Sequence, residues 1–280
     1  MKNKIKKLIR GILKLFKEKE MYPIPKVMNR DKILEGKVAL ITGGSGGIGF
    51  AIAKSFVESG CKVIITGTNE EKLKENCKKL GGGVNSKYMV WNILETKNIP
   101  NKLEEALEKF EEKRIDILVN SAGIVAKHSF REITEKEYDT IMDTNAKGTF
   151  FMSQAVGEYM IKNKIKGHIL NVTSSSALRP AWTPYQMSKW AVRGFTLGLA
   201  DVLLPYGIVV NAIAPGPVAT PMLDKKEGES IYNESSPSGR YAVPSEIAEL
   251  AVFMVSDLGN LIVGDTFYIT GGSGTISYHN

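Results

Sequence analysis

The chain has 280 residues, of which 43% are hydrophobic and 24% are charged. This length suits one large α/β domain and is too short for two, and the composition is that of an ordinary globular protein. Its two cysteines, Cys61 and Cys77, exclude a disulfide framework and are not spaced with histidines as metal ligands. We therefore expect two structural thiols, no metal site and a cytoplasmic protein.

The net charge of +7 belongs to the start of the chain. Residues 1–20 hold eight basic and two acidic side chains, which leaves 29 basic against 28 acidic residues in the remainder. Because the body of the chain is nearly neutral, its charge predicts no nucleic-acid partner.

Residues 1–20 are predicted to form a basic amphipathic helix, with apolar residues at helical spacing on one face. Its lysines exclude a membrane span, and it lacks the apolar core and cleavage site of a signal peptide. Three interpretations stay open: peripheral membrane contact, packing on the domain or on a second subunit, and fraying. Pro23 and Pro25 end the helix, so residues 21–35 are interpreted as a linker into a domain over residues 36–280.

From Lys37 onward, apolar strands alternate with helical patterns. Such alternation requires a mostly parallel sheet covered by helices. The sequence therefore predicts an α/β fold: a single Rossmann-type, doubly wound, parallel seven-stranded sheet with helices on both faces. Strands are predicted at Val38–Thr42, Lys62–Thr66, Lys87–Ile93, Ile115–Val119, His168–Thr173, Ile208–Ala214 and Asp265–Thr270, and helices near Ile48–Glu58, Glu70–Leu80, Lys102–Lys113, Thr134–Lys162, Thr183–Leu204 and Ser245–Ser256. Capping boxes are predicted at Thr134 with Glu137 and at Thr183 with Gln186.

A glycine-rich turn joins the first strand to the first helix of this domain, with the sequence Thr-Gly-Gly-Ser-Gly-Gly-Ile-Gly over residues 42–49. Glycines permit a tight turn and close approach of a pyrophosphate, and the following helix N-terminus presents free N–H groups to the phosphates. This strand–turn–helix context predicts a bound dinucleotide. The residues expected to contact it here are Gly43, Ser45, Gly47, Ile48 and Gly49.

Tyr185 and Lys189 stand one helical turn apart on one face of a predicted helix. A free phenol titrates near about 10. A nearby ammonium group, joined by an oxidised nicotinamide ring, favours the phenolate and makes the tyrosine a usable acid/base. Hydroxyl groups follow the strand His168–Thr173 at its carboxyl end, where open α/β sheets bind ligands. One of Ser174, Ser175 and Ser176 is expected to stabilise charge on a substrate oxygen.

These motifs resemble the short-chain dehydrogenase/reductase family in its classical branch, over about residues 36–275. The resemblance implies Ser174, Tyr185 and Lys189 as catalytic residues, and Asn145 as the residue that holds a water against the lysine. It also implies that a loop after the sixth strand fixes the nicotinamide. Further cofactor contacts implied by the resemblance are Asn120, Ala122, Gly123, Pro215, Gly216, Val218 and Thr220, besides Tyr185 and Lys189 themselves.

The end of the second strand bears on the choice of nicotinamide. It carries no carboxylate to accept hydrogen bonds from a ribose, which favours NADP(H) over NAD(H). Phosphate recognition favours arginine or lysine, yet the family's usual basic positions hold Gly46 and Thr68 here. Thr68 and Asn69 are therefore expected to serve the 2′-phosphate, while Asn92 and Ile93 lie near adenine.

The sequence thus predicts an oxidoreductase that transfers a hydride between NAD(P)(H) and an alcohol/ketone pair on a small molecule. Two other functions stay open: an isomerase or dehydratase that uses bound cofactor, and a non-catalytic nucleotide-binding protein. A homodimer or homotetramer is expected by resemblance. The segment Pro221–Arg240 is expected to cover the substrate, with Leu178, Trp182 and residues 124–130 nearby, but the substrate itself is not identified.

Overall fold

The computed structural model describes residues 32–223, 225 and 228–276. The predicted amphipathic helix over residues 1–20, and the linker up to residue 31, lie outside the described residues. The described end of the linker turns onto the domain: Leu34 is fully buried, and its N–H donates to the carbonyl oxygen of Ser59 at 3.0 Å. No helix among the described residues is long and apolar enough to cross a membrane.

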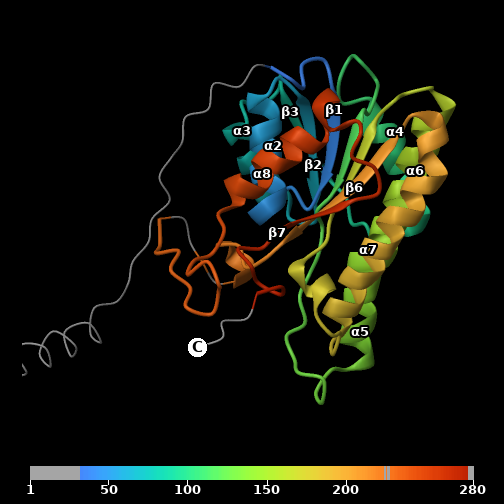
Figure 1. The fold of residues 1–280 in the computed structure, drawn as a ribbon. Helices are drawn as coiled ribbons and strands as arrows, with labels where there is room; N and C mark the ends of the chain where they lie inside the picture. Colours follow the sequence, from blue (N-terminus) through green and yellow to red (C-terminus); the bar gives the residue numbers. More distant parts are fainter. Residues whose placement is uncertain (1–31, 224, 226–227, 277–280) are drawn as a thin grey trace, which may run out of the picture.

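Seven parallel strands form one sheet, in the order β3-β2-β1-β4-β5-β6-β7 (Figure 1). The predicted Rossmann-type sheet is confirmed. The order changes direction between β1 and β4, which is the switch point where open α/β sheets bind ligands. The strands are β1 (Val38–Thr42), β2 (Lys62–Gly67), β3 (Ser86–Val90), β4 (Ile117–Asn120), β5 (His168–Val172), β6 (Val209–Pro215) and β7 (Thr266–Ile269).

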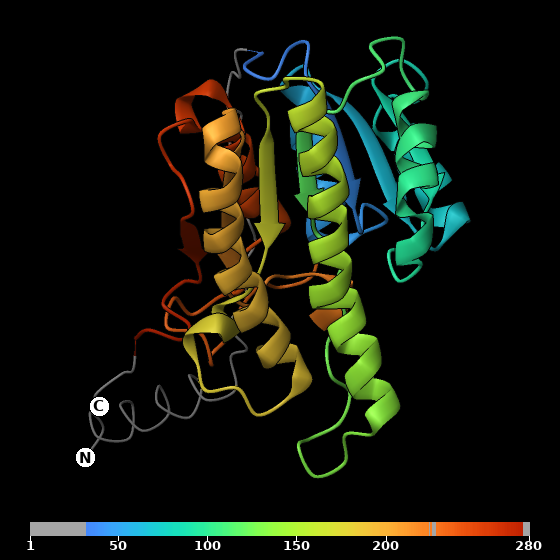
Figure 2. The same ribbon diagram turned by 90° about the vertical axis from the view of Figure 1, so that its right-hand side faces the viewer.

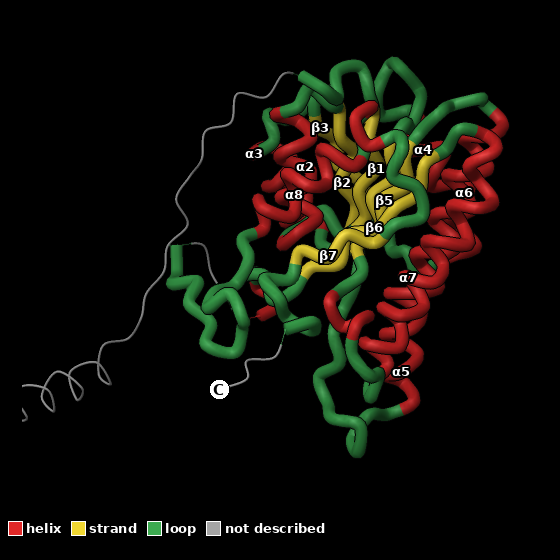
Figure 3. Tube along the Cα trace, in the orientation of Figure 1, coloured by secondary structure: helices red, strands yellow, loops and turns green. Residues whose placement is uncertain are grey.

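Helices cover both faces of the sheet (Figure 3). One face packs against α2, α3 and α8 through Phe56, Leu73 and Ile247, and the other packs against α4, α6 and α7 through Leu103, Val156 and Ala200. Cys61 and Cys77 are buried free thiols, as predicted for structural residues. The α-helices are α2 (Gly47–Glu58), α3 (Glu70–Lys79), α4 (Ile99–Leu107), α5 (Glu135–Met142), α6 (Thr149–Lys162), α7 (Pro184–Leu203) and α8 (Pro244–Met254).

Two predicted elements have different bounds in the structure. Strand β3 ends at Val90 rather than at Ile93, because the side chain of Asn92 accepts the N–H of Leu94 at 3.1 Å and turns the chain. Helix α4 begins at Ile99 rather than at Lys102, with Pro100 in its first turn, and ends at Leu107 instead of Lys113. The other strand bounds agree with the prediction within two residues.

The helix predicted over Thr134–Lys162 contains a π-helical turn, η2, at Asp143–Gly148 between α5 and α6. Figure 2 shows the three parts as one continuous rod lying beside α7. A helix-period pattern does not distinguish a π turn from an α turn, because both keep the chain helical. Such turns often mark functional sites, and this one contains Asn145.

A buried polar network ties β4 and β5 to the helices above them. The Nδ2 atom of Asn120 donates to Ser153 Oγ at 2.8 Å and to Asn171 Oδ1 at 2.9 Å. Asn171 in turn donates to Thr196 Oγ1 at 3.0 Å, so the network reaches from α6 to α7. It fixes both helices over the strand ends that carry the site residues.

We predict that Asn171→Ala lowers the free energy of unfolding by about 2–3 kcal/mol, because it leaves buried polar partners unsatisfied. Urea unfolding followed by circular dichroism measures this change. The exposed Asn101→Ala serves as the control, with an expected change below about 0.5 kcal/mol. Equal effects of the two substitutions would contradict a structural role for the network.

Candidate active site

The glycine-rich turn joins β1 to α2 and packs closely on the loop after β4. Gly43 has φ +67°, and a β-carbon there would lie 2.7 Å from Ala122 Cα, so only glycine fits this contact. The N-terminus of α2 has no side-chain cap and no acidic residue in its first turn. Its free N–H groups and positive dipole end therefore suit phosphate oxygens.

The other predicted cofactor segments meet this turn. Thr42 Oγ1 accepts the N–H groups of Ser121 and Ala122 at 3.1 and 3.2 Å, which binds the β4 end to the β1 end. The loop after β6 returns to the same place, since Thr220 Cγ2 lies 3.6 Å from the position of a β-carbon on Gly47. In that loop Pro215 ends β6 and Gly216 packs against the backbone of Thr270, while the side chains of Val218 and Thr220 are buried.

Asn145 joins the loop after β4 to α7. Its Oδ1 accepts the N–H of Ile124 at 2.9 Å, and its Nδ2 donates to the Ile124 carbonyl at 2.9 Å and to Ser188 Oγ at 3.0 Å. Oδ1 also faces Gly123, where a β-carbon would lie 3.3 Å from it and 3.5 Å from Lys189 Nζ. Asn145 thus holds the backbone around the lysine. The contact with Ser188 was not predicted, because sequence spacing does not relate η2 to α7.

Lys189 is a buried cation, only 6% exposed. Its Nζ donates to the carbonyl oxygen of Val172 at 3.0 Å, at the end of β5. Burial lowers the pKa of Lys189 to about 8. None of the ion pairs among the described residues includes it. Desolvation therefore favours its neutral form.

Tyr185 shares this environment. Lys189 Nζ lies 5.8 Å from the centre of the Tyr185 ring. Burial raises the pKa of Tyr185, and a hydrogen bond with the side chain of Ser174 opposes that rise. A phenol that keeps its proton in a dry site, beside a hydroxyl group, is suited to donate that proton to a ligand oxygen.

The three serines after β5 differ in their surroundings. Ser174 and Ser175 are each 8% exposed, and Ser176 is less buried. Ser174 Oγ accepts the N–H of Ser176 at 3.1 Å and is the hydroxyl hydrogen-bonded with Tyr185. The hydrogen bond with Tyr185 distinguishes Ser174 from the other two serines.

Comparisons with known proteins identify the family. The sequence model of the family described as "Enoyl-(Acyl carrier protein) reductase" matches residues 43–274. The chain belongs to the short-chain dehydrogenase/reductase family. It is therefore an NAD(P)-dependent oxidoreductase that acts on C=O and CH–OH groups.

Several relatives of this family are reductases. The 3-oxoacyl-(acyl-carrier-protein) reductase FabG of Aquifex aeolicus is 34% identical over 245 residues, which are 85% of this chain and 98% of the relative. FabG of Thermotoga maritima is 36% identical over the same length and with the same coverage.

Solved structures of the family agree with the fold. The 3-ketoacyl-(acyl-carrier-protein) reductase of Brucella melitensis, complexed with NADH, has a TM-score of 0.79 and 32% identity, covering 87% of this chain and all of that one. A variant of the actinorhodin polyketide ketoreductase with NADPH has a TM-score of 0.77 and 28% identity, covering 86% and 98%.

The residues predicted to contact the adenosine half of the dinucleotide lie in different surroundings: some in loops or at a helix cap, and one in the core. Asn69 caps α3, where its Oδ1 accepts the N–H of Lys72 at 2.9 Å, and Thr68 stands just before it, after the end of β2. Asn92 forms the turn after β3, and the side chain of Ile93 is buried in the core beside Gly148. Ser45 lies beside the end of β2, where its Oγ is 3.3 Å from the position of a β-carbon on Gly67, and its carbonyl accepts Asn76 Nδ2 at 2.9 Å. Ile48 packs partly on the core.

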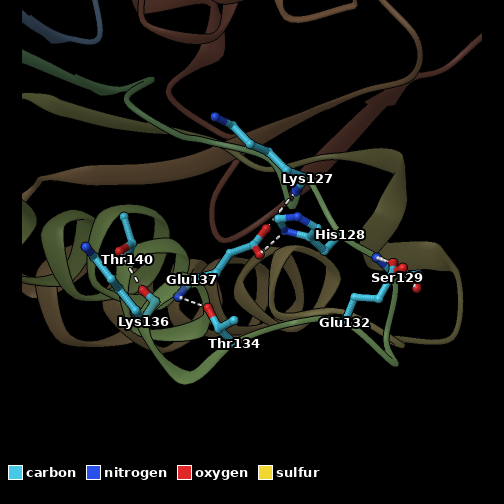
Figure 4. Close-up of polar contacts among 8 residues, drawn as sticks. All are labelled: Lys127, His128, Ser129, Glu132, Thr134, Lys136, Glu137 and Thr140. Carbon is cyan, nitrogen blue, oxygen red and sulfur yellow. Dashed lines mark hydrogen bonds and ion pairs between the residues drawn. The ribbon is translucent and has the colours of Figure 1, made fainter.

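The loop between β4 and α5 is anchored by an acidic side chain. Glu137 accepts the N–H of Lys127 at 2.7 Å and lies 2.6 Å from His128 Nδ1 (Figure 4). The predicted capping box at this helix is therefore only half present: Thr134 Oγ1 accepts the N–H of Glu137, while the glutamate binds the loop. The second predicted capping box, at the start of α7, is present, and in it Gln186 Oε1 accepts the Thr183 N–H at 3.0 Å.

We predict that the burial of Lys189 makes the stability of the cofactor-free protein depend on pH. Between pH 8 and 10.5 the unfolded state binds more protons than the native state, so stability rises with pH across this window. Lys189→Met removes this gain. The free energy of unfolding of Lys189→Met should exceed that of the wild type most below pH 8, and this difference should shrink by about 3 kcal/mol towards pH 10.5.

Chemical unfolding at a series of pH values measures this difference. The exposed Lys74→Met is the matched control, and its offset from the wild type should stay constant over the same range. An advantage of Lys189→Met that did not change with pH would contradict a burial-lowered pKa.

Proposed function

We propose that this enzyme reduces the ketone of a 3-oxoacyl thioester to the alcohol, with NADPH as the preferred reductant. The observation that carries the proposal is the convergence of Tyr185, Ser174 and buried Lys189 at the carboxyl end of β5. Binding of the dinucleotide beside these groups is supported by the glycine-rich turn, by the uncapped N-terminus of α2 and by the approach of Thr220 to Gly47.

In this proposal the bound cofactor supplies a hydride to the carbonyl carbon. Tyr185 gives its proton to the carbonyl oxygen, so that the ketone becomes an alcohol. Ser174 donates a hydrogen bond to the same oxygen and stabilises the negative charge that develops on it. Lys189 stabilises the phenolate left on Tyr185, and Asn145 keeps the surrounding backbone in place.

The substrate class rests on the relatives and on the side chains around the site. The reductases named above act on 3-oxoacyl groups of acyl-carrier protein. Large apolar side chains are exposed in segments that flank the site: Phe130 (76%), Trp182 (53%) and Met222 (51%). Burying such surface against an acyl chain is favourable. No observation among the described residues favours an isomerase or dehydratase over this reduction.

We predict that Tyr185→Phe lowers the rate of acetoacetyl-CoA reduction by about 10²–10⁴-fold, because the proton donor is lost. The affinity for NADPH should stay within about threefold of the wild type, since the ring remains. Absorbance at 340 nm measures the rate, and the fluorescence of NADPH measures the affinity. Ser176→Ala is the control for Ser174→Ala, and only the latter should reduce the rate strongly.

Turnover that survived Tyr185→Phe would contradict the proposed acid. A wild type that bound NADPH but reduced no 3-oxoacyl thioester would contradict the substrate class and leave the reaction type to be tested on other ketones.

We also propose a homodimer or homotetramer that associates through α6 and α7. The rings of Phe150 and Phe195 are in contact, with centres 5.1 Å apart and planes tilted by 40°, and Phe150 is 42% exposed. They line a shallow hollow with Ala146, Lys147, Ala191 and Val192.

We predict a dimer or tetramer mass by light scattering, and a smaller assembly for Phe150→Glu. A monomeric wild type would contradict this proposal.

A further inference from the structure

Lys72 reaches over the glycine-rich turn from helix α3. Its Nζ lies 3.0 Å, and its Cε 3.4 Å, from the position that a β-carbon on Gly46 would take. The backbone at Gly46 is extended, with φ 175° and ψ −179°, so any residue could adopt it. The missing side chain at Gly46 therefore leaves the space that the ammonium group of Lys72 occupies.

The face of α3 that carries Lys72 is fixed against the turn. Asn76 lies one helical turn later on the same face and is only 5% exposed. Its Nδ2 donates to the carbonyl oxygen of Ser45 at 2.9 Å. On the turn's other side, a β-carbon on Gly67, at the end of β2, would lie 3.3 Å from Ser45 Oγ. The position of Lys72 over the glycine turn thus follows from a docked helix, which begins at Glu70 just after the end of β2.

Charges nearby leave Lys72 available for an anion. None of the ion pairs found within the described part of the chain includes it. Glu75 is paired with Lys79 at 2.7 Å, and this pairing, more than the charge of Lys72, lowers the pKa of Glu75. Glu70 and Glu71 begin α3 and are exposed, where carboxylates stabilise the helix N-terminus. The end of β2 itself, at Gly67 and Thr68, carries no carboxylate.

We propose that Lys72 binds the 2′-phosphate of NADP(H) and is the residue that selects the phosphorylated cofactor. This inference rests on the proposed NADPH preference and supplies the missing cation for it. The region between the glycine turn and the end of the second strand is where a dinucleotide fold receives the ribose 2′ group. An ammonium group there acts as a point charge on phosphate, which the hydroxyl of Thr68 and the amide of Asn69 do not provide.

Lys72→Gln tests this assignment by equilibrium binding, without any turnover. We expect NADPH to bind at least about 10-fold more weakly to the variant, while the affinity for NADH stays within about twofold. Adenosine 2′,5′-bisphosphate and 5′-AMP provide a second pair of ligands without nicotinamide, and only the first should lose affinity. Lys74→Gln on the same helix is the matched control and should leave all four dissociation constants unchanged.

A second test restores a positive charge to the site from the glycine turn instead of from α3. In the Lys72→Gln background, Gly46→Arg places a guanidinium group in the vacated space, and we expect it to restore most of the NADPH affinity. Failure of Lys72→Gln to change the NADPH affinity, or an equal loss for NADPH and NADH, would overturn the role of Lys72 alone. A wild type that bound neither nicotinamide would instead overturn the proposed function.

Discussion

The burial of one cation, Lys189, is the constraint on which the site depends. A lysine in a dry environment loses hydration, and here a backbone carbonyl at the end of β5 replaces only part of it. The site must therefore present further polar atoms close by. Gly123 lacks a side chain between Lys189 and Asn145, and this absence keeps the two polar groups adjacent. Tyr185 shares the same low-dielectric surroundings. Burial therefore raises the pKa of Tyr185 and lowers that of Lys189, in each case towards the neutral form.

The scaffold keeps this costly arrangement in place. The π turn at Asp143–Gly148 positions the Asn145 side chain to bond the loop after β4 and the helix that carries the tyrosine and the lysine. Beneath it, the amide network of Asn120 and Asn171 ties β4 and β5 to α6 and α7. Rigid elements on both sides hold Tyr185 and Lys189 in one geometry, which is how a site is preorganised before a ligand arrives.

Local sequence patterns predicted most of this fold. The features that they missed depend on the kind of helical turn, on a single side-chain bond, or on contacts between distant segments. The glycine turn, the Tyr185–Lys189 spacing and the strand–helix alternation are short-range signals, so they could be interpreted directly. The π turn was missed because it keeps helical periodicity, and the end of β3 because one side-chain bond of Asn92 decides it. The place of Lys72 over Gly46 depends on how α3 docks, which spacing along the chain does not show. The cofactor contacts and the catalytic roles remain predictions for binding and kinetic work.

We propose that Tyr185 is a proton donor whose acidity depends on its neighbours and on the bound cofactor. The most direct test is a tyrosinate absorbance titration of the wild type minus Tyr185→Phe, with and without NADP⁺. We expect a Tyr185 pKa above its ordinary value of about 10 in the free protein, and a clearly lower value with the positive nicotinamide bound. A pKa that was unperturbed in the free protein and did not change on binding would contradict this proposal.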